Sequence, residues 1–480
     1  MSWEMVIGLE VHVQLATATK AFCRCPNRFG DEPNRNVCPV CLGLPGALPV
    51  ATRDMVEQGA RLALALGADV REHSAWVRKN YFYPDLPKGY QITQFEFPLA
   101  VGGELPLRDG DGRVTAVGLE RLHLEEDAGK LLHGEGDAAD FSFVDFNRCG
   151  APLVEIVSRP NLRRPEDAAS FLRELRRLVV RLGVSDGNME EGSLRCDANI
   201  SVRRRGESAF RTRAEIKNLN SFRFVKQALE FEAKRQIDVY ENGGRVVQET
   251  RWFDSRRGVT HSMRSKEEAH DYRYFPEPDL PPLVLDRTRI NAWREALPEL
   301  PWHMHERFVR QYGLSHYDAA LLSDDAEVAA FFEEVATQAD PKQAANWING
   351  ELAAVWKARD GGPAKGPISA ADVSELLNLI ANGAISGKIG KDVLAATVAG
   401  EGSPAQVVRQ RGWMQIRDVD TLRKIIREVL AAHPKQVAAY RAGETKLLGF
   451  FVGRLMERTA GRANPQLANE LIAAELRETD

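Results

Sequence analysis

Acidic and basic side chains alternate with apolar ones along the segment 119–130 of this chain. Arg121, His123 and Glu125 would share one face of an extended strand, with leucines on the other face. Carboxylates bind divalent cations and basic groups neutralise phosphates, so such a face suits chemistry on a magnesium nucleotide. The plain alternative is a half-buried antiparallel strand whose outer face is simply wet.

The same alternation recurs in other segments, so we expect several polar strand faces to meet in one sheet. Their members are Glu10, His12 and Gln14; Arg195, Asp197 and Asn199; Arg213, Glu215 and Lys217; and Glu155, the lone acid of the run 152–157. Solvated sheet faces usually carry Thr, Ser and scattered Lys rather than carboxylates beside His. Converging faces of this kind predict a cation-binding floor with a basic rim.

Four cysteines form two close pairs, Cys23 with Cys25 and Cys38 with Cys41, in a segment whose Pro, Asn and Gly content predicts a loop. Four thiolates in two pairs are a ligand set for tetrahedral zinc. No ligand position looks open for catalysis, so we predict a structural zinc. Unmetallated thiols and a redox pair are the alternatives.

The composition is that of an ordinary globular protein, with 44% hydrophobic residues, 28% charged residues and a net charge of -4. This charge argues neither for nor against nucleic acid. The 480 residues suggest about three domains. No apolar run approaches the roughly 20 residues of a membrane span, and no leader pattern precedes the first strand. We therefore expect a cytoplasmic protein.

Strand alternation dominates the first 290 residues or so, and helix periodicity takes over after them. The fold class we expect is α+β, with an antiparallel-sheet domain followed by all-α domains. Helices are predicted over 55–66, 163–182, 218–241, 303–312, 326–337 and 341–357, and further helices begin near Ser369, Ser403, Asp420 and Asn464.

Two further stretches could contact a nucleotide or a nucleic acid. The segment 78–91 is aromatic and basic, so it could stack a base or grip a phosphate, or pack on the rim of the core. Lys446, Arg454, Arg458 and Arg462 are spaced by multiples of four, which predicts one basic helical face. That face could contact a phosphate backbone, or it could simply be solvated.

Several motifs together resemble the GatB family of aspartyl/glutamyl-tRNA amidotransferase subunits. They cover Gly8–Gln14 (GLEVHVQ), Val37–Pro45 (VCPVCLGLP), Arg78–Gln91, His123–Lys130 (HLEEDAGK), Gly187–Ser201, Glu215–Ser221, Arg264–Ala269 and Asp271–Asp279. The resemblance extends more loosely into the helical tail. One departure is Val77, where the family pattern has an acid before Arg78.

The resemblance implies a fold, an activity and a domain order. Residues 1–292 would form a catalytic cradle domain related to glutamine synthetase and carrying the zinc knuckle. Residues 293–405 would form a helical domain, and residues 406–480 a helical tail that binds tRNA. The activity would be that of a ligase in protein biosynthesis. ATP phosphorylates the side-chain carboxylate of misacylated Glu-tRNA(Gln) or Asp-tRNA(Asn), and ammonia then displaces the phosphate.

The resemblance also implies roles for individual residues. His12, Glu125 and Glu155 would hold Mg²⁺, with Glu10 and Lys79 completing the catalytic set. Tyr81, Tyr83, Asp85 and Lys88 would line the acceptor or ammonia path together with Lys79. The strand faces add Arg195, Asp197, Asn199 and Lys217 as hypothetical phosphate or metal contacts. The cofactors would be ATP, Mg²⁺ and a structural Zn²⁺.

The sequence has no Ser-rich, Gly-rich amidase loop with a partner Lys. Ammonia would therefore come from a separate amidase (glutaminase) partner, in a heterotrimer that a small third protein completes. Two rival interpretations remain open. The chain could be a non-catalytic, zinc-bearing tRNA adaptor, or an ATP-dependent ligase acting on a free amino acid.

Overall fold

The computed structural model describes residues 2–109, 112–134, 140–263, 272–359, 361–416 and 418–477. The chain forms two compact units, Met1–His303 and Met304–Asp480. The segment 264–269 and Asp271, which contribute to the family resemblance, lie outside the described residues. Within the described ranges, no helix combines the length and the apolar character needed to cross a membrane.

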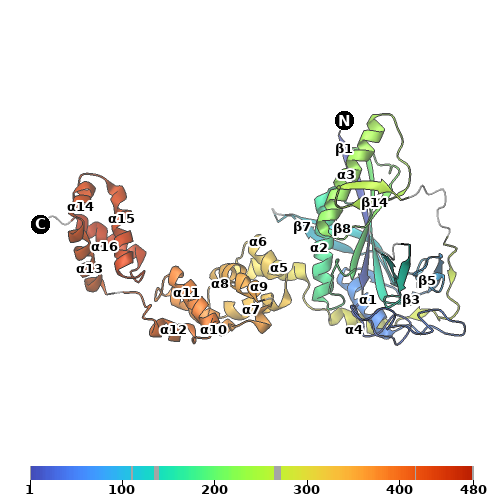
Figure 1. Cartoon of the computed structure of the whole chain (residues 1–480), viewed down its shortest axis with the longest axis horizontal. Helices are drawn as coiled ribbons and strands as arrows, with labels where there is room; N and C mark the ends of the chain where they lie inside the picture. Colours follow the sequence, from blue (N-terminus) through green and yellow to red (C-terminus); the bar gives the residue numbers. More distant parts are fainter. Residues whose placement is uncertain are drawn as a thin grey trace. The chain divides into compact units, whose positions relative to one another are not determined.

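The first unit is built on a ten-stranded sheet (Figure 1). Its strands in spatial order are β15 (Val259–Ser262), β14 (Thr250–Asp254), β13 (Ala214–Lys217), β12 (Leu194–Arg204), β1 (Trp3–Gln14), β11 (Pro152–Ser158), β8 (Val114–Glu126), β6 (Ala100–Val101) and β2 (Asp69–Val70), with β7 (Glu104–Arg108) also paired to β8. The strand pairs are antiparallel except β13 with β14, which are parallel. The predicted α+β class is confirmed, and its antiparallel sheet contains this one parallel pair.

Three smaller strand groups stand beside the main sheet. They are β16 (Phe275–Pro276) with β4 (Val77–Asn80) and β5 (Tyr90–Thr93); β10 (Ser142–Asp145) with β9 (Lys130–His133); and β17 (Leu283–Val284) with β3 (His73–Ser74). The first group is a hairpin, β4–β5, extended by a short strand from much later in the chain. It includes the ends of the aromatic, basic segment 78–91.

Helices cover one face of the main sheet and leave the other face to polar side chains. They are α1 (Arg53–Ala65), α2 (Pro165–Arg181), α3 (Phe222–Glu241) and α4 (Arg287–Glu295), and α2 and α3 lie side by side (Figure 1). In β1, Leu9, Val11 and Val13 are buried in the core, whereas Glu10 and His12 alternate with them and are only partly buried. The predicted two-faced strand is therefore confirmed.

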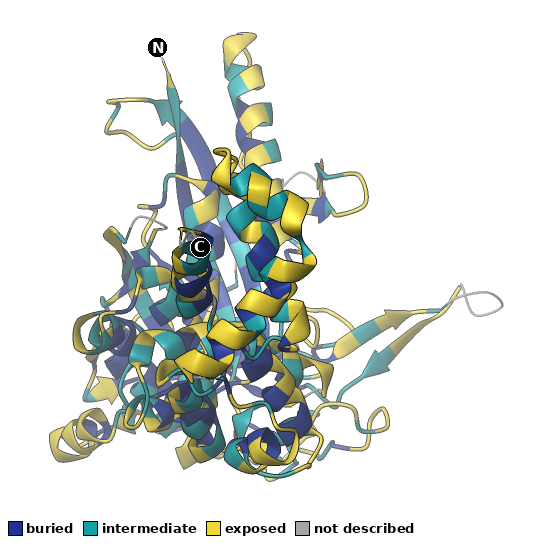
Figure 2. Ribbon diagram, turned by 90° about the vertical axis from the view of Figure 1, so that its left-hand side faces the viewer, coloured by how far each residue is buried: buried dark blue, intermediate teal, exposed yellow. Residues whose placement is uncertain are grey.

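The second unit is helical and has two separate hydrophobic cores. The first core is formed by α5 (Pro301–Tyr312), α6 (His316–Leu322), α7 (Ala326–Ala336), α8 (Pro341–Trp347), α9 (Ala353–Ala358), α10 (Ala370–Ala381), α11 (Gly387–Val398) and α12 (Pro404–Gln410). The second is formed by α13 (Val419–Ala432), α14 (Pro434–Arg441), α15 (Leu448–Arg458) and α16 (Pro465–Arg477). Helices carry buried residues on one side and exposed ones on the other (Figure 2). The three-domain division remains a prediction.

Two helix predictions need correction in the second unit. The helix predicted over 341–357 is interrupted by a π-helical turn, Ile348–Leu352, between α8 and α9. The predicted single basic face is also wrong. Lys446 lies in a 3₁₀ turn before α15, and Arg462 lies beyond its end, because Ala460 and Gly461 adopt positive φ and stop the helix.

Helix α1 approaches the sheet closely at Gly59. A Cβ atom at this position would lie 2.7 Å from Leu124 Cδ2 and 3.3 Å from Val154 Cγ2. Both residues directly precede acids of the polar face, Glu125 and Glu155. The absence of a side chain at Gly59 therefore sets the distance between α1 and the strands that carry these acids.

We expect Gly59→Val to destabilise the first unit by about 1–3 kcal/mol, because the added methyl groups overpack the contact with Leu124 and Val154. Gly449→Val is the matched control, since Gly449 lies in α15 with no atom within 4 Å of a Cβ built there. Scanning calorimetry measures both. An unchanged melting temperature for Gly59→Val would contradict the close approach.

Candidate active site and metal-binding clusters

Three neighbouring strands bring two acids and two histidines together on the polar face of the main sheet. His12 on β1 lies opposite Glu155 on β11, which in turn lies opposite His123 on β8. Directly opposed side chains share a face and lie within contact distance. Glu125, two residues after His123, shares that face because side chains alternate along a strand.

The distances define a compact cluster. His12 Nε2 lies 3.4 Å from Glu125 Oε1 and 3.5 Å from Glu155 Oε2. His123 Nε2 lies 3.1 Å from Glu155 Oε2. One ligand atom from each of His12, Glu125 and Glu155 lies within 4.8 Å of the others. The sequence-predicted magnesium residues are therefore close enough to share one ion.

The electrostatics of the cluster keep both acids ionised. Burial works against it, but hydrogen bonds to Glu125 and Glu155 raise the pKa of His12 to about 10. Burial also opposes the ionised form of Glu125, yet hydrogen bonds with His12 and His123 hold the pKa of Glu125 below its usual range. Hard oxygen donors fit Mg²⁺ and the imidazole fits it less well. Two carboxylates that need positive charge between them nevertheless suit a divalent cation.

The cluster forms part of a polar cavity of about 320 Å³, here called the acidic cavity. Its remaining lining residues come from the main sheet, from the β4–β5 hairpin and from nearby loops. The residues that line it are Glu10, His12, Lys79, Thr93, Gln94, Phe95, Arg121, His123, Glu125, Glu155, Asp197, Asn199, Arg213, Glu215, Lys217, Gln248, Glu249, Tyr272 and Tyr274.

One end of the acidic cavity is built by β1, β12 and β13. Asn199 Nδ2 donates a 2.9 Å hydrogen bond to Glu10 Oε1. Lys217 Nζ lies 2.7 Å from Asp197 Oδ2 and 3.1 Å from Glu215 Oε1. Burial and the charges of nearby acids, including Glu155, raise the pKa of Glu10. This end thus combines clustered acids with one strongly held ammonium.

The other side of the acidic cavity is basic and aromatic. Lys79 of β4 lies with its Nζ 5.0 Å from the centre of the Tyr272 ring. Although burial lowers it, the pKa of Lys79 is raised, above all by the charge of Glu125. Tyr274 stacks on Phe95 with ring centres 4.4 Å apart. A cation facing two ionised carboxylates, roofed by aromatic rings, can orient an anionic substrate.

Two basic residues predicted for the same site are engaged elsewhere. Lys88 pairs with the buried Glu126 and lines a separate cavity of about 170 Å³ next to the cysteine loops. Arg195 Nη2 lies 2.8 Å from Asp127 Oδ2, outside the lining of the acidic cavity. Lys79 and Lys88 therefore do not share one cavity, and the phosphate role of Arg195 stays a prediction.

The rest of the aromatic segment also lies outside the acidic cavity. Tyr81 contacts Tyr272 edge-on, with ring centres 6.3 Å apart. Tyr83 is largely exposed, and the backbone oxygen of Asp85 accepts a hydrogen bond from Gly129 N. The expected acceptor or ammonia path along these residues stays a prediction.

Sequence reasoning passed over several residues of the cavity. His123 and Arg121 were visible in the strand alternation but received no role there, and Arg213 continues the alternation of β13. Among the described residues, Arg121 and Arg213 have no hydrogen-bond or ion-pair partner, and Arg121 Nε is buried. Tyr272 carries no periodic signal that could have placed it here.

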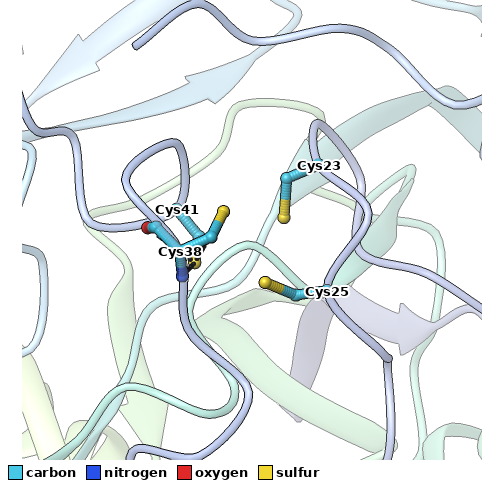
Figure 3. Close-up of side chains that lie close together, drawn as sticks. All are labelled: Cys23, Cys25, Cys38 and Cys41. Atoms are coloured by element: carbon cyan, nitrogen blue, oxygen red, sulfur yellow. Dashed lines mark hydrogen bonds between the residues drawn. The ribbon is translucent and has the colours of Figure 1, made fainter.

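The four loop cysteines face one another from two turns of the chain (Figure 3). Their sulfur atoms all lie within 4.8 Å of one another, and Cys38 and Cys41 Sγ are 3.9 Å apart. Zinc–sulfur bonds of about 2.3 Å at tetrahedral angles place sulfurs roughly 3.8 Å apart. The geometry therefore fits the predicted four-cysteine zinc site.

A buried lysine accompanies this cluster. Lys20 is fully buried, donates a 2.6 Å hydrogen bond to the carbonyl of Asn36 and lies with its Nζ 3.7 Å from Cys41 Sγ. A hydrogen bond with Cys23, the backbone amide of Cys38 and the charge of Lys20 lower the pKa of Cys41 to about 5. The site is thus prepared for thiolates, which are the metal-binding form of cysteine.

Comparison with known proteins gives a consistent picture. Residues 5–291 match the model of the GatB/GatE catalytic domain, and residues 330–476 match that of the GatB domain. GatB-type subunits of aspartyl/glutamyl-tRNA(Asn/Gln) amidotransferase are 50% identical in Carboxydothermus hydrogenoformans over 476 residues and in Solidesulfovibrio magneticus over 475 residues, with 99% of each chain covered. The corresponding protein from Alkalilimnicola ehrlichii is 50% identical over 478 residues, covering 99% of this chain and 100% of its own.

The protein purified without chelator is expected to carry about one equivalent of zinc, and Cys25→Ala to lose it, because three thiolates bind the ion far more weakly than four. Metal analysis by mass spectrometry measures the content. Cys196→Ala is the matched control, since Cys196 is a buried thiol outside the cluster. Less than about half an equivalent in the unmodified protein would count against the site.

Proposed function

The chain belongs to the GatB/GatE family, and we propose that it is the component in which ATP activates misacylated tRNA for amidation. The substrate is the side-chain carboxylate of Glu-tRNA(Gln), of Asp-tRNA(Asn) or of both. The observation that carries the proposal is the acidic cavity, in which His12, Glu125 and Glu155 converge beside Lys79. The enzyme class is a carbon–nitrogen ligase.

The chemistry explains why a nucleotide is needed. A carboxylate is a poor electrophile because its leaving group would be an oxide or hydroxide. In the first step a carboxylate oxygen attacks the γ-phosphorus of ATP, and ADP leaves. In the second step ammonia attacks the carbon of the acyl phosphate, inorganic phosphate leaves and a proton is lost to yield the amide. Phosphoryl transfer depends mainly on positioning and on neutralising charge.

The metal residues fit the first step. A Mg²⁺ ion held by His12, Glu125 and Glu155, with Glu10 beside them, would neutralise charge on the transferring phosphoryl group. Arg121 and Arg213 line the same cavity without protein partners among the described residues, so both guanidinium groups are available to phosphate oxygens. We assign them a phosphate-binding role alongside Asn199 and Lys217.

Other residues serve the acceptor. Lys79 presents a buried ammonium to the cavity, where it can hold the substrate carboxylate in line with the γ-phosphate. The rings of Tyr272 and Tyr274 line the same side and would limit the access of water to the acyl phosphate. Excluding water favours attack by ammonia over hydrolysis.

Partner proteins complete the proposal. Ammonia would come from an amidase (glutaminase) partner, and a small third protein would complete the heterotrimer. Large exposed apolar side chains around the cysteine loops, including Phe29, Leu48 and Val50, support a protein contact on the first unit. The cofactors are ATP and Mg²⁺, with zinc as a structural ion.

Tight coupling of ATP cleavage to misacylated tRNA is the first expectation, and Glu125→Gln should lower it about 100-fold or more, since a ligand that neutralises transferring charge is lost. The assay uses the chain with its amidase partner, Mg²⁺ and no amide donor. Glu120→Gln is the control, because Glu120 lies on the same strand but is exposed and outside the cavity.

The outcomes separate the rival functions. Near-normal cleavage by Glu125→Gln would refute the metal assignment. Cleavage without tRNA but with a free amino acid would indicate the ligase. No cleavage by an assembly that still binds tRNA would indicate the non-catalytic adaptor.

For the helical tail we propose contact with the tRNA backbone through Lys446, Arg454, Arg458 and Arg462. Arg454 and Arg458 form 2.7 Å ion pairs with Glu457 and Glu428, and all four of these side chains are substantially exposed. Exposed pairs of this kind contribute little to stability, so a phosphate can compete for the arginines.

Replacing both Arg454 and Arg458 by Ala should weaken tRNA binding and make the slope of log affinity against log salt shallower by about 2, because two phosphate contacts are lost. Filter binding over a salt series measures this slope. Arg411→Ala, which removes an exposed arginine paired with Glu401, is the control. Unchanged affinity and slope in the double variant would leave the basic tail as a solvated surface.

A further inference from the structure

A second pocket adjoins the acidic cavity along β1 and β12. It has a volume of about 230 Å³ and differs in character, because its walls include the apolar side chains of Val6, Val157 and Pro160. Phe210 stands at its edge with 65% of its surface exposed, so the ring face is open to a ligand. We call it the Gly8 pocket, after the residue at its floor.

Gly8 has no evident structural reason to be glycine. Its φ lies outside the left-handed region, so the backbone does not require it. A Cβ atom built on Gly8 would approach no atom closer than 3.7 Å, at Pro160, which is ordinary contact. A glycine inside a strand weakens the strand and often marks a place where a ligand approaches the backbone closely. The open space above Gly8 is therefore best explained by a ligand.

The two cavities are continuous and lie in line. They share Glu10, Asn199 and Arg213 as lining residues. Gly8, Glu10 and His12 occupy alternate positions of β1 and so share one face, with Asn199 opposite Gly8. Four residues of strand span roughly 13 Å. This length from the Gly8 pocket to the metal residues matches the reach of an extended nucleoside triphosphate.

The junction of the two cavities carries an unengaged positive charge. Arg213 lines both cavities, is exposed, and forms no hydrogen bond or ion pair with any described residue. A ligand running from one cavity to the other must pass this guanidinium, which prefers phosphate oxygens.

We propose that the Gly8 pocket binds the purine nucleoside of the nucleotide whose terminal phosphate lies in the acidic cavity, with Arg213 on the phosphates between them. The apolar walls and the Phe210 ring fit a flat heteroaromatic base. This inference rests on the proposed function, since it locates the nucleotide used there.

The terminal adenosine of tRNA offers the same purine chemistry, but it fits the junction less well. Between its ribose and the side-chain carboxylate, an aminoacyl ester carries no anionic group for Arg213. A triphosphate places negative charge at that position. The unengaged arginine therefore favours the nucleotide, and the test keeps the two sources apart.

The test compares two probes on the full-length chain assembled with its amidase partner. Mg²⁺ with a non-hydrolysable ATP analogue reports the whole nucleotide site, and Mg²⁺ with tripolyphosphate reports only the phosphate part. Gly8→Val should weaken the ATP analogue at least about tenfold, because its side chain occupies the space of the base. Tripolyphosphate binding and the KM for misacylated tRNA should change less than about twofold, since neither ligand uses the filled space.

Two further variants guard against a folding defect. Gly8→Ala adds one methyl group with ordinary contacts and should give a smaller loss for the ATP analogue alone. Gly118→Ala is the control, because Gly118 is also a strand glycine but lines neither cavity and would meet only the flexible Arg159 side chain. Arg213→Gln should weaken the ATP analogue and tripolyphosphate together.

Each other outcome overturns the inference. Unchanged binding of the ATP analogue to Gly8→Val, or equal losses for both probes, would exclude the base from this pocket. A raised KM for tRNA alone would assign the pocket to the terminal adenosine. If the unmodified assembly binds no ATP analogue at all, the proposed function itself fails, which is distinguishable from failure of this assignment.

Discussion

Two buried carboxylates that face each other across neighbouring strands are the constraint around which the first unit is arranged. Glu125 and Glu155 would repel each other in a site shielded from water, and burial alone would favour their neutral forms. His12 and His123 lie between and beside them at 3.1–3.8 Å and supply the compensating charge. A face that concentrates charge in this way must be backed by an apolar one, and the helices α1 to α3 cover that opposite side.

Strand β1 extends this arrangement along one line. Gly8, Glu10 and His12 point to the same side, while Leu9, Val11 and Val13 anchor the strand in the core. Because the strand is central and paired on both edges, the spacing between its functional positions is fixed by backbone geometry rather than by flexible loops. The loop that follows it carries the cysteine cluster, whose metal would tie two turns of irregular chain together beside the sheet.

Much of the site could be predicted because a period of two is a local property of the sequence. The alternation placed Glu10, His12 and Glu125 on one face without knowledge of the strand order. It could not determine which strands are neighbours, so the pairing of Lys88 with Glu126 and of Arg195 with Asp127 was not foreseen. Long basic side chains can choose among several acids, and only the folded structure decides. Likewise the spacing in the tail ignored the helix end at Ala460.

The central claim is that this chain transfers the γ-phosphoryl group of ATP to the side-chain carboxylate of misacylated tRNA. The most direct measurement uses tRNA whose side-chain carboxylate carries ¹⁸O in both oxygens, with ATP, Mg²⁺ and the complete amidotransferase supplied with glutamine. Mass spectrometry of the inorganic phosphate then follows the label. The account predicts that one ¹⁸O atom appears in each phosphate released, because the bridging oxygen of the acyl phosphate leaves with phosphorus. Phosphate that contains no ¹⁸O would contradict it.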